Sequence, residues 1–142
     1  MMSLEEGMDV RAISLPRPWP QAIVDGILHH VPLVGVSSWD LDDAGVLLAL
    51  HAAKAYDEEL AASLLQQHRW VAPKADACPT GIVAVGEVYA LHCPGDYGAW
   101  TLTLNPVLTV KPYAMPGQRG VWRLPDALAN RVRGLWDSRP VA

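Results

Sequence analysis

The pattern of apolar and polar residues along this chain alternates between short runs typical of β-strands and stretches with helical spacing. The apolar run at residues 10–15 stops against Pro16 and predicts a strand, because proline pushes the residue before it into an extended conformation. Pro18 suits the start of a helix, since its φ angle is already helical and its missing N–H would have no partner there. We therefore expect a helix from about Pro18 to Asp25, ended by Gly26.

Two more helices are expected further along the chain. Asp57 suits an N-cap, and the acids after it favour the start of a helix. One face of this helix is expected to carry Leu60, Leu64, Leu65 and His68. A last helix is predicted over residues 125–136. Its apolar face is expected to carry Leu128, Val132 and Leu135.

Strands account for most of the remaining pattern. They are predicted over residues 31–37, 46–53, 81–91, 99–104, 107–111 and 121–124. Pro32 marks the first of these as an edge strand, and Asn105 with Pro106 predicts a turn. With about three short helices, these strands predict an α+β fold, a small mixed or antiparallel β-barrel. One domain is expected over residues 10–142, behind a flexible tail at 1–9.

Composition narrows the classes of protein to which the chain can belong. The chain is 51% hydrophobic and 18% charged, which argues against extensive disorder. Its formal net charge of −4 argues against general coating of DNA or RNA, which needs a basic surface. Two cysteines, no secretory leader and no apolar run of ~18 residues predict a cytoplasmic protein without a membrane span.

Four segments, in this order, resemble the ASCH family, a branch of the PUA-like superfold. They are Ala12-Ile-Ser-Leu-Pro-Arg-Pro-Trp, the His51-Ala-Ala-Lys ending of residues 46–54, Gly81-Ile-Val-Ala-Val-Gly-Glu-Val, and residues 99–124 with Trp100, Asn105-Pro106 and Gly120-Val-Trp-Arg-Leu. The resemblance implies a compact PUA-like β-barrel with helices at its openings and a cleft beneath the first helix.

The chain departs from this family just after its first helix. Many relatives carry charged residues in the slots that Leu28, Val31 and Leu33 occupy here. Hydrolytic relatives that act on acylated cytidine use a lysine and a threonine from this region, and neither is evident in this chain. The resemblance therefore carries no enzymatic activity over to it.

Six residues are candidates for ligand binding, namely Arg17, Trp19, His51, Lys54, Asn105 and Arg119. Arg17 and Trp19 lie where the first strand turns into the first helix, where a guanidinium can clamp a phosphate or base edge and an indole can stack on a base. The structural alternative has Trp19 packing the helix onto the barrel and Arg17 in solvent. Asn105 and Arg119 stand in expected loops, as anion or base contacts, or as a turn residue and a solvated arginine.

Three residues are candidates for chemistry. His51 and Lys54 follow a buried strand, where a lysine can hold a phosphate or transfer a proton. The alternatives are a lysine on the barrel rim and a hydrogen-bonded structural histidine. Glu87 interrupts an apolar strand and is either a barrel-lining acid or a rim residue. Only a barrel-lining Glu87 would serve as a general acid or base with Lys54.

No metal and no cofactor is expected, because the adjacent pairs His29-His30 and His92-Cys93 lack the usual spacing of zinc ligands. Three functions compete. The first is an RNA- or nucleotide-binding module that takes a nucleotide or unpaired base into the cleft. The second is an amidohydrolase or nuclease acting on a modified nucleoside or RNA, with Lys54 and Glu87 transferring protons and a water, Ser37 or Ser38 as nucleophile. The third is a degenerate scaffold that binds a protein along residues 28–34. A homodimer through the edge strand at 31–37 is also expected.

Overall fold

The computed structural model describes residues 9–33, 46–92 and 101–140 of the chain. Its strands are β1 (Asp9–Arg17), β2 (Val31–Pro32), β3 (Val46–Tyr56), β4 (Gly81–His92), β5 (Thr101–Tyr113) and β6 (Val121–Arg123). Its helices are α1 (Trp19–Val24), α2 (Glu58–His68) and α3 (Asp126–Asp137). The predicted α+β class, with short helices beside a mixed sheet, is confirmed.

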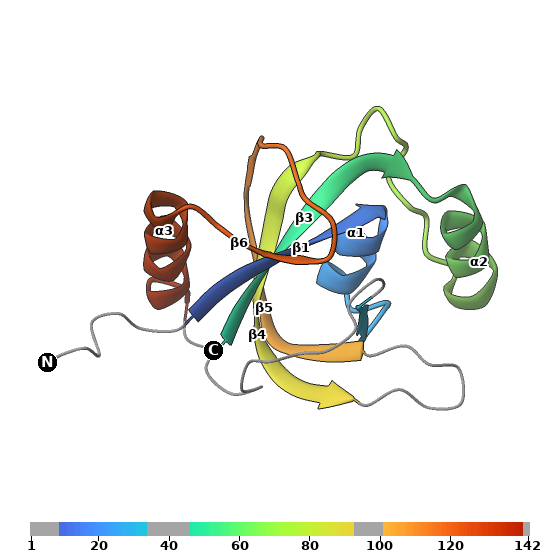
Figure 1. Cartoon of the computed structure of the whole chain (residues 1–142). Helices are drawn as coiled ribbons and strands as arrows, with labels where there is room; N and C mark the ends of the chain where they lie inside the picture. The colour runs from blue at the N-terminus through green and yellow to red at the C-terminus, as the bar shows by residue number, and fades with distance from the viewer. Residues whose placement is uncertain (1–8, 34–45, 93–100, 141–142) are drawn as a thin grey trace, which may run out of the picture.

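One curled sheet connects these strands in the order β2-β5-β4-β3-β1-β6. β1 and β3 pair in parallel, whereas the other neighbours pair antiparallel. The curl gives a half-barrel, with α1 packed on its inner side and α3 on its outer side (Figure 1). β2 lies at the edge, as Pro32 predicts. Residues 34–37 of the predicted edge strand lie outside the described residues, and the homodimer through this edge stays a prediction.

β3 is buried on both faces, which explains its nearly continuous apolar sequence. Leu48 and Leu50 point into the inner core, against Ile23 of α1. Leu47 and Ala49 point into the outer core, where α3 packs. Each leucine-sized side chain buried in this way contributes about 1.5–3 kcal/mol. This strand therefore ties the two helical layers to one sheet.

The signals at the helix ends are confirmed. Gly26 has a φ angle of +76° just after α1, in the left-handed region that a helix end needs. The side chain of Asp57 accepts a hydrogen bond from the backbone N–H of Leu60 at 2.9 Å and caps α2. Both signals are local, and this explains why the sequence alone was sufficient to find them.

The predicted helix faces are partly wrong. In α2, Leu64 is buried, but Leu65 is 52% exposed and His68 is exposed. The reason is that α2 stands beyond the end of the sheet and does not lie across a face of it (Figure 1). In α3, Val132 is buried as predicted, whereas Leu135 is 43% exposed. The buried stripe of α3 consists of Ala129, Val132 and Trp136.

The predicted turn at Asn105 and Pro106 is wrong, because β5 runs through both residues without a break. Gly86 pairs with Val107 while Val88 pairs with Leu104, so two steps along β4 face three steps along β5. Such an extra residue is a β-bulge, and a bulge tolerates a proline that has no N–H for the ladder. The turn-like dipeptide marks an irregular point within the strand and not its end.

We expect Gly81→Ala to destabilise the protein by about 2–4 kcal/mol. Gly81 opens β4 with a φ angle of +93°, and a Cβ atom there would overlap the backbone carbonyl of Tyr113. Gly134→Ala is the matched control, since a Cβ at this position in α3 meets nothing within 4 Å. The control should gain up to about 1 kcal/mol from helix propensity. Urea unfolding measures both changes, and equal stability of the two variants would contradict the prediction.

Candidate functional site

The candidate site lies where β1 and β3 run side by side in parallel. In the register of this pair, Ser14 of β1 lies opposite His51 of β3. His51 is only 4% exposed, so its ring nitrogens need hydrogen-bond partners within the protein. The segment between β5 and β6 folds back over this pair and supplies one partner from the carbonyl of Met115.

The hydrogen bonds around His51 have defined directions. The Met115 carbonyl can only accept, so the 2.8 Å contact to His51 Nε2 places a proton on that nitrogen. The indole of Trp122 can only donate, so Ser14 Oγ accepts from Trp122 Nε1 at 3.2 Å. In the neutral imidazole, Nδ1 is then a bare acceptor, and the Ser14 hydroxyl donates to it at 3.2 Å. The chain of bonds runs from Trp122 through Ser14 and His51 to Met115.

Packing holds the imidazole in place as well. The ring of Trp122 meets the His51 ring edge to face, with centroids 5.8 Å apart and an angle of 74° between the planes. On another side, Gly117 lies so close that an added Cβ would overlap Ser14 Oγ and come within 2.5 Å of His51 Cε1. Position 117 therefore requires a residue without a Cβ atom, and glycine allows residues 115–120 to pack against the Ser14–His51 pair.

Two cavities flank the same segment. The first cavity, of about 400 Å³, is lined by Ser14, His51, Ala52, Ala53, Lys54, Thr80 and residues 115–119. The second cavity, of about 720 Å³, is lined by Ile13, Ser14, Leu15, Pro16, Trp19, Pro32 and residues 118–120. Ser14, Gln118 and Arg119 belong to both linings. The volumes of the two cavities lie within the usual range for small-molecule sites.

Four predicted ligand-binding residues meet around these cavities. His51, Lys54 and Arg119 line the first cavity, and Trp19 and Arg119 line the second. Trp19 also packs against the inner core, so the structural alternative for it holds at the same time. His51 is hydrogen-bonded and buried, which matches its structural alternative.

The residues missed by sequence reasoning are Ser14, Thr80 and Gln118. Ser14 lies within the segment at residues 12–19, but only its register opposite His51 reveals its importance. This register is a long-range property that the pattern of either strand alone does not contain. Thr80 and Gln118 come from loops and carry no signal of their own.

Arg17 has a role that neither sequence interpretation anticipated. Its guanidinium donates to the carbonyls of Ala53 at 3.1 Å, Lys54 at 2.5 Å, Ala75 at 2.5 Å and Cys78 at 2.9 Å. It also lies 5.8 Å from the ring centroid of Tyr56. Most of its N–H groups are therefore used inside the protein. Arg17 ties the end of β1 to β3 and to the loop before β4, and it lines neither cavity.

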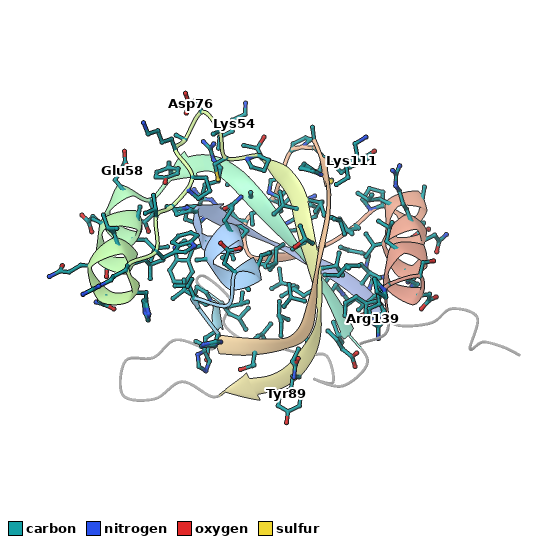
Figure 2. All side chains as sticks on the ribbon, turned by 180° about the vertical axis from the view of Figure 1, so that it is seen from behind. Lys54, Glu58, Asp76, Tyr89, Lys111 and Arg139 are labelled. Atoms are coloured by element: carbon teal, nitrogen blue, oxygen red, sulfur yellow. The ribbon has the colours of Figure 1, made fainter. Side chains whose placement is uncertain are left out.

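The two predicted catalytic residues lie far apart. Glu87 pairs with Leu47, whereas Lys54 stands seven positions further along the same strand. At ~3.3 Å per residue, this separates them by ~23 Å along the sheet. In Figure 2, Lys54 and Tyr89, a close neighbour of Glu87 on β4, lie toward opposite ends of the sheet. One proton-transfer site cannot use both groups in this fold.

The remaining predicted positions also lie away from the two cavities. Asn105 is exposed in the middle of β5 and lines neither of them. Ser37 and Ser38 lie outside the described residues. Val31 and Leu33 are buried in the inner core, with Leu28 packed against it, so Val31 and Leu33 offer no surface groove to a partner protein.

Among the described residues, the charged side chains that line the two cavities are all positive. Lys54 and Arg119 are exposed, and neither forms an ion pair within the described part of the chain. No carboxylate belongs to either lining among the described residues. The arrangement thus offers two cations, one aromatic wall and a hydrogen-bonded serine–histidine pair.

The described residues contain neither a membrane-spanning helix nor a cluster of metal ligands. No helix in ranges 9–33, 46–92 and 101–140 is long and apolar enough to cross a membrane. Within the same residues, no three His, Cys, Asp or Glu side chains gather as a metal site would need. Among known proteins, no family model matches the chain, and no curated protein matches its sequence.

We expect Arg17→Lys to destabilise the protein by about 2–4 kcal/mol, because an ammonium cannot reproduce a planar fork that reaches four carbonyls. Arg123→Lys is the matched control, since Arg123 is exposed on β6. The control should change stability by less than about 0.5 kcal/mol. Chemical denaturation measures both, and a near-neutral Arg17→Lys would refute the role of Arg17 as a clamp.

Cys78 should react slowly with iodoacetamide while the protein is folded. Burial raises the pKa of its thiol, with Arg17 acting in the opposite direction, and the thiolate is the reactive form. The pKa of the Cys78 thiol is higher in the folded state than in the unfolded state. The contribution of this thiol to the free energy of unfolding is therefore complete below the ordinary thiol pKa, and it is lost as the pH rises through the folded-state pKa. Peptide-resolved mass spectrometry of folded and urea-unfolded protein measures the rate at Cys78. Equal rates would contradict the prediction.

Proposed function

We propose that this protein binds a nucleotide or an unpaired RNA base in the two cavities beside residues 115–120. The observation that carries the proposal is the sharing of Arg119 between a cavity with Lys54 and a cavity with Trp19. Cations hold phosphates, and an indole wall offers a stacking surface for a base. A ligand with a phosphate at one end and a flat base at the other matches this arrangement.

The proposed ligand is small because the positive charge is local. The whole chain carries a formal net charge of −4, so it lacks the basic surface that tracks a long backbone. Recognition then depends on stacking and on contacts to base edges, as in the binding of unpaired RNA bases.

The resemblance to ASCH domains is part of the same proposal. It implies a cleft beneath the first helix, and the second cavity is walled by Trp19, the first residue of α1. The cytoplasmic location expected from the sequence also belongs to the proposal and is supported by the free thiol of Cys78.

We expect Lys54→Ala and Arg119→Ala each to weaken nucleotide binding about fivefold, a loss of about 1 kcal/mol for an exposed charge contact. Isothermal titration of AMP, CMP, GMP, UMP and short single-stranded RNAs measures this effect. Lys111→Ala is the matched control, since this exposed lysine lies beside α3 and outside both cavities. With two phosphate contacts, the logarithm of affinity should fall with the logarithm of salt with a slope of about −1.4.

Two outcomes would count against nucleotide binding. A slope steeper than about −3 would indicate a broad electrostatic interface in place of a two-cation pocket. Unchanged affinity in the double variant Lys54→Ala/Arg119→Ala would place the ligand elsewhere on the protein.

A further inference from the structure

We infer that Ser14 and His51 form a nucleophile–base pair that hydrolyses carboxylic esters. The inference starts from the hydrogen-bond directions around His51. The Met115 carbonyl fixes the proton on Nε2, so the bare Nδ1 faces the Ser14 hydroxyl at 3.2 Å. A serine that donates to a histidine, which a third group holds in one tautomer, is the arrangement that activates a serine nucleophile.

Ser14 is placed where a substrate can reach it. Its side chain belongs to the lining of both cavities, and it is half-buried where His51 is buried. Lys54 and Arg119 line the first cavity beside it. These cations are suited to stabilise the negative oxygen of a tetrahedral intermediate. Nucleophile, base and electrophilic groups thus meet within one site.

The reaction balances without any further co-reactant. Ser14 Oγ attacks the ester carbonyl carbon while His51 Nδ1 takes the hydroxyl proton. The bond from this carbon to the leaving alcohol then breaks, and His51 returns the proton to the alcohol oxygen. Water attacks the acyl group on Ser14, passes a proton to His51, and the Ser14 oxygen regains that proton as the carboxylic acid leaves. Ester and water become acid and alcohol.

The class of substrate follows from the two cavities. A small acyl ester needs only Ser14 and His51, whereas an O-acylated nucleotide would also use Lys54, Arg119 and Trp19. The nucleotide part of this inference rests on the proposed function, and the ester chemistry does not. This pair also differs from the pair Lys54 and Glu87, which the sheet separates by ~23 Å.

A purely structural network is the rival explanation. Trp122, Ser14, His51 and Met115 could serve only to hold residues 115–120 on the barrel. That role predicts a loss of stability in Ser14→Ala, because buried polar groups of His51 and Trp122 lose their partner. It predicts no covalent bond to Ser14, which makes acylation the decisive measurement.

The first experiment uses the unaltered protein. It is incubated with p-nitrophenyl acetate and, separately, with a fluorophosphonate, from which Ser14 Oγ displaces fluoride at phosphorus. We expect release of p-nitrophenol above the buffer rate and a covalent adduct on the peptide that contains Ser14, located by tandem mass spectrometry. An adduct confined to other residues, or none with either reagent, overturns the inference.

The second experiment uses variants. Ser14→Ala and His51→Gln should each lower the rate at least about 100-fold, the usual contribution of a general base. Ser138→Ala and His29→Gln are matched controls at exposed positions outside both cavities, and their rates should stay unchanged. Where thermal melting shows that Ser14→Ala does not fold, Ser14→Cys replaces it and should still be acylated at position 14. A folded Ser14→Ala that keeps the rate overturns the inference.

The two proposals fail in different ways. Acylation of Ser14 with no nucleotide binding leaves an esterase whose substrate is not a nucleotide. Nucleotide binding with no acylation leaves the binding module and removes the esterase. Hydrolysis of 3′-O-acetyl-AMP faster than of p-nitrophenyl acetate, together with loss of that preference in Lys54→Ala, supports both.

Discussion

The parallel pairing of β1 with β3 is the constraint on which the rest of the molecule depends. Its register places Ser14 opposite His51 and Arg17 opposite Tyr56, so residues from distant parts of the chain share one end of the sheet. β3 is buried on both faces and has no freedom to shift. A slip of one residue would move every side chain of β1 to the wrong face. The core thereby fixes the geometry of the site.

Arg17 completes this constraint at the end of β1. Its four carbonyl acceptors lie on β3 and on the loop before β4. One guanidinium can donate hydrogen bonds to all four carbonyls, because its N–H groups lie in one plane and point in several directions. The arginine that was predicted to bind a ligand thus joins β1 to β3 and to the loop before β4.

The elements were predictable where the signal is local. Gly26 and Asp57 mark helix ends through their own backbone and side-chain chemistry. Asn105 and Pro106 misled, because a bulge depends on the partner strand and not on the dipeptide. At the site, His51 and Lys54 were predictable as the polar end of an apolar strand. Ser14 was not, because only the sheet brings it to His51.

Glu87 is a second residue whose place relative to the site could not be predicted without the strand register. From the sequence alone, Lys54 and Glu87 are two polar interruptions of neighbouring apolar strands, and nothing tells which ends of these strands meet. The antiparallel pairing of β3 with β4 settles it by setting Glu87 against Leu47, at the end far from Lys54. Charged groups on neighbouring strands can be grouped only once the register is known.

The placement of Gly117 bears on the proposed ligand site, because this residue packs against the Ser14–His51 pair. Gly117 lies so close to the Ser14–His51 pair that an added Cβ would overlap Ser14 Oγ. The two cavities flank this pair, one with Lys54 and Thr80 in its lining and the other with Trp19 and Leu15. A ligand that spans both must cross at Ser14 and Arg119. An anionic end on the lysine side and a flat, less polar end on the tryptophan side bring the middle of the ligand to the serine hydroxyl. The proposed binding and the proposed ester chemistry therefore both depend on Ser14, which lines both cavities.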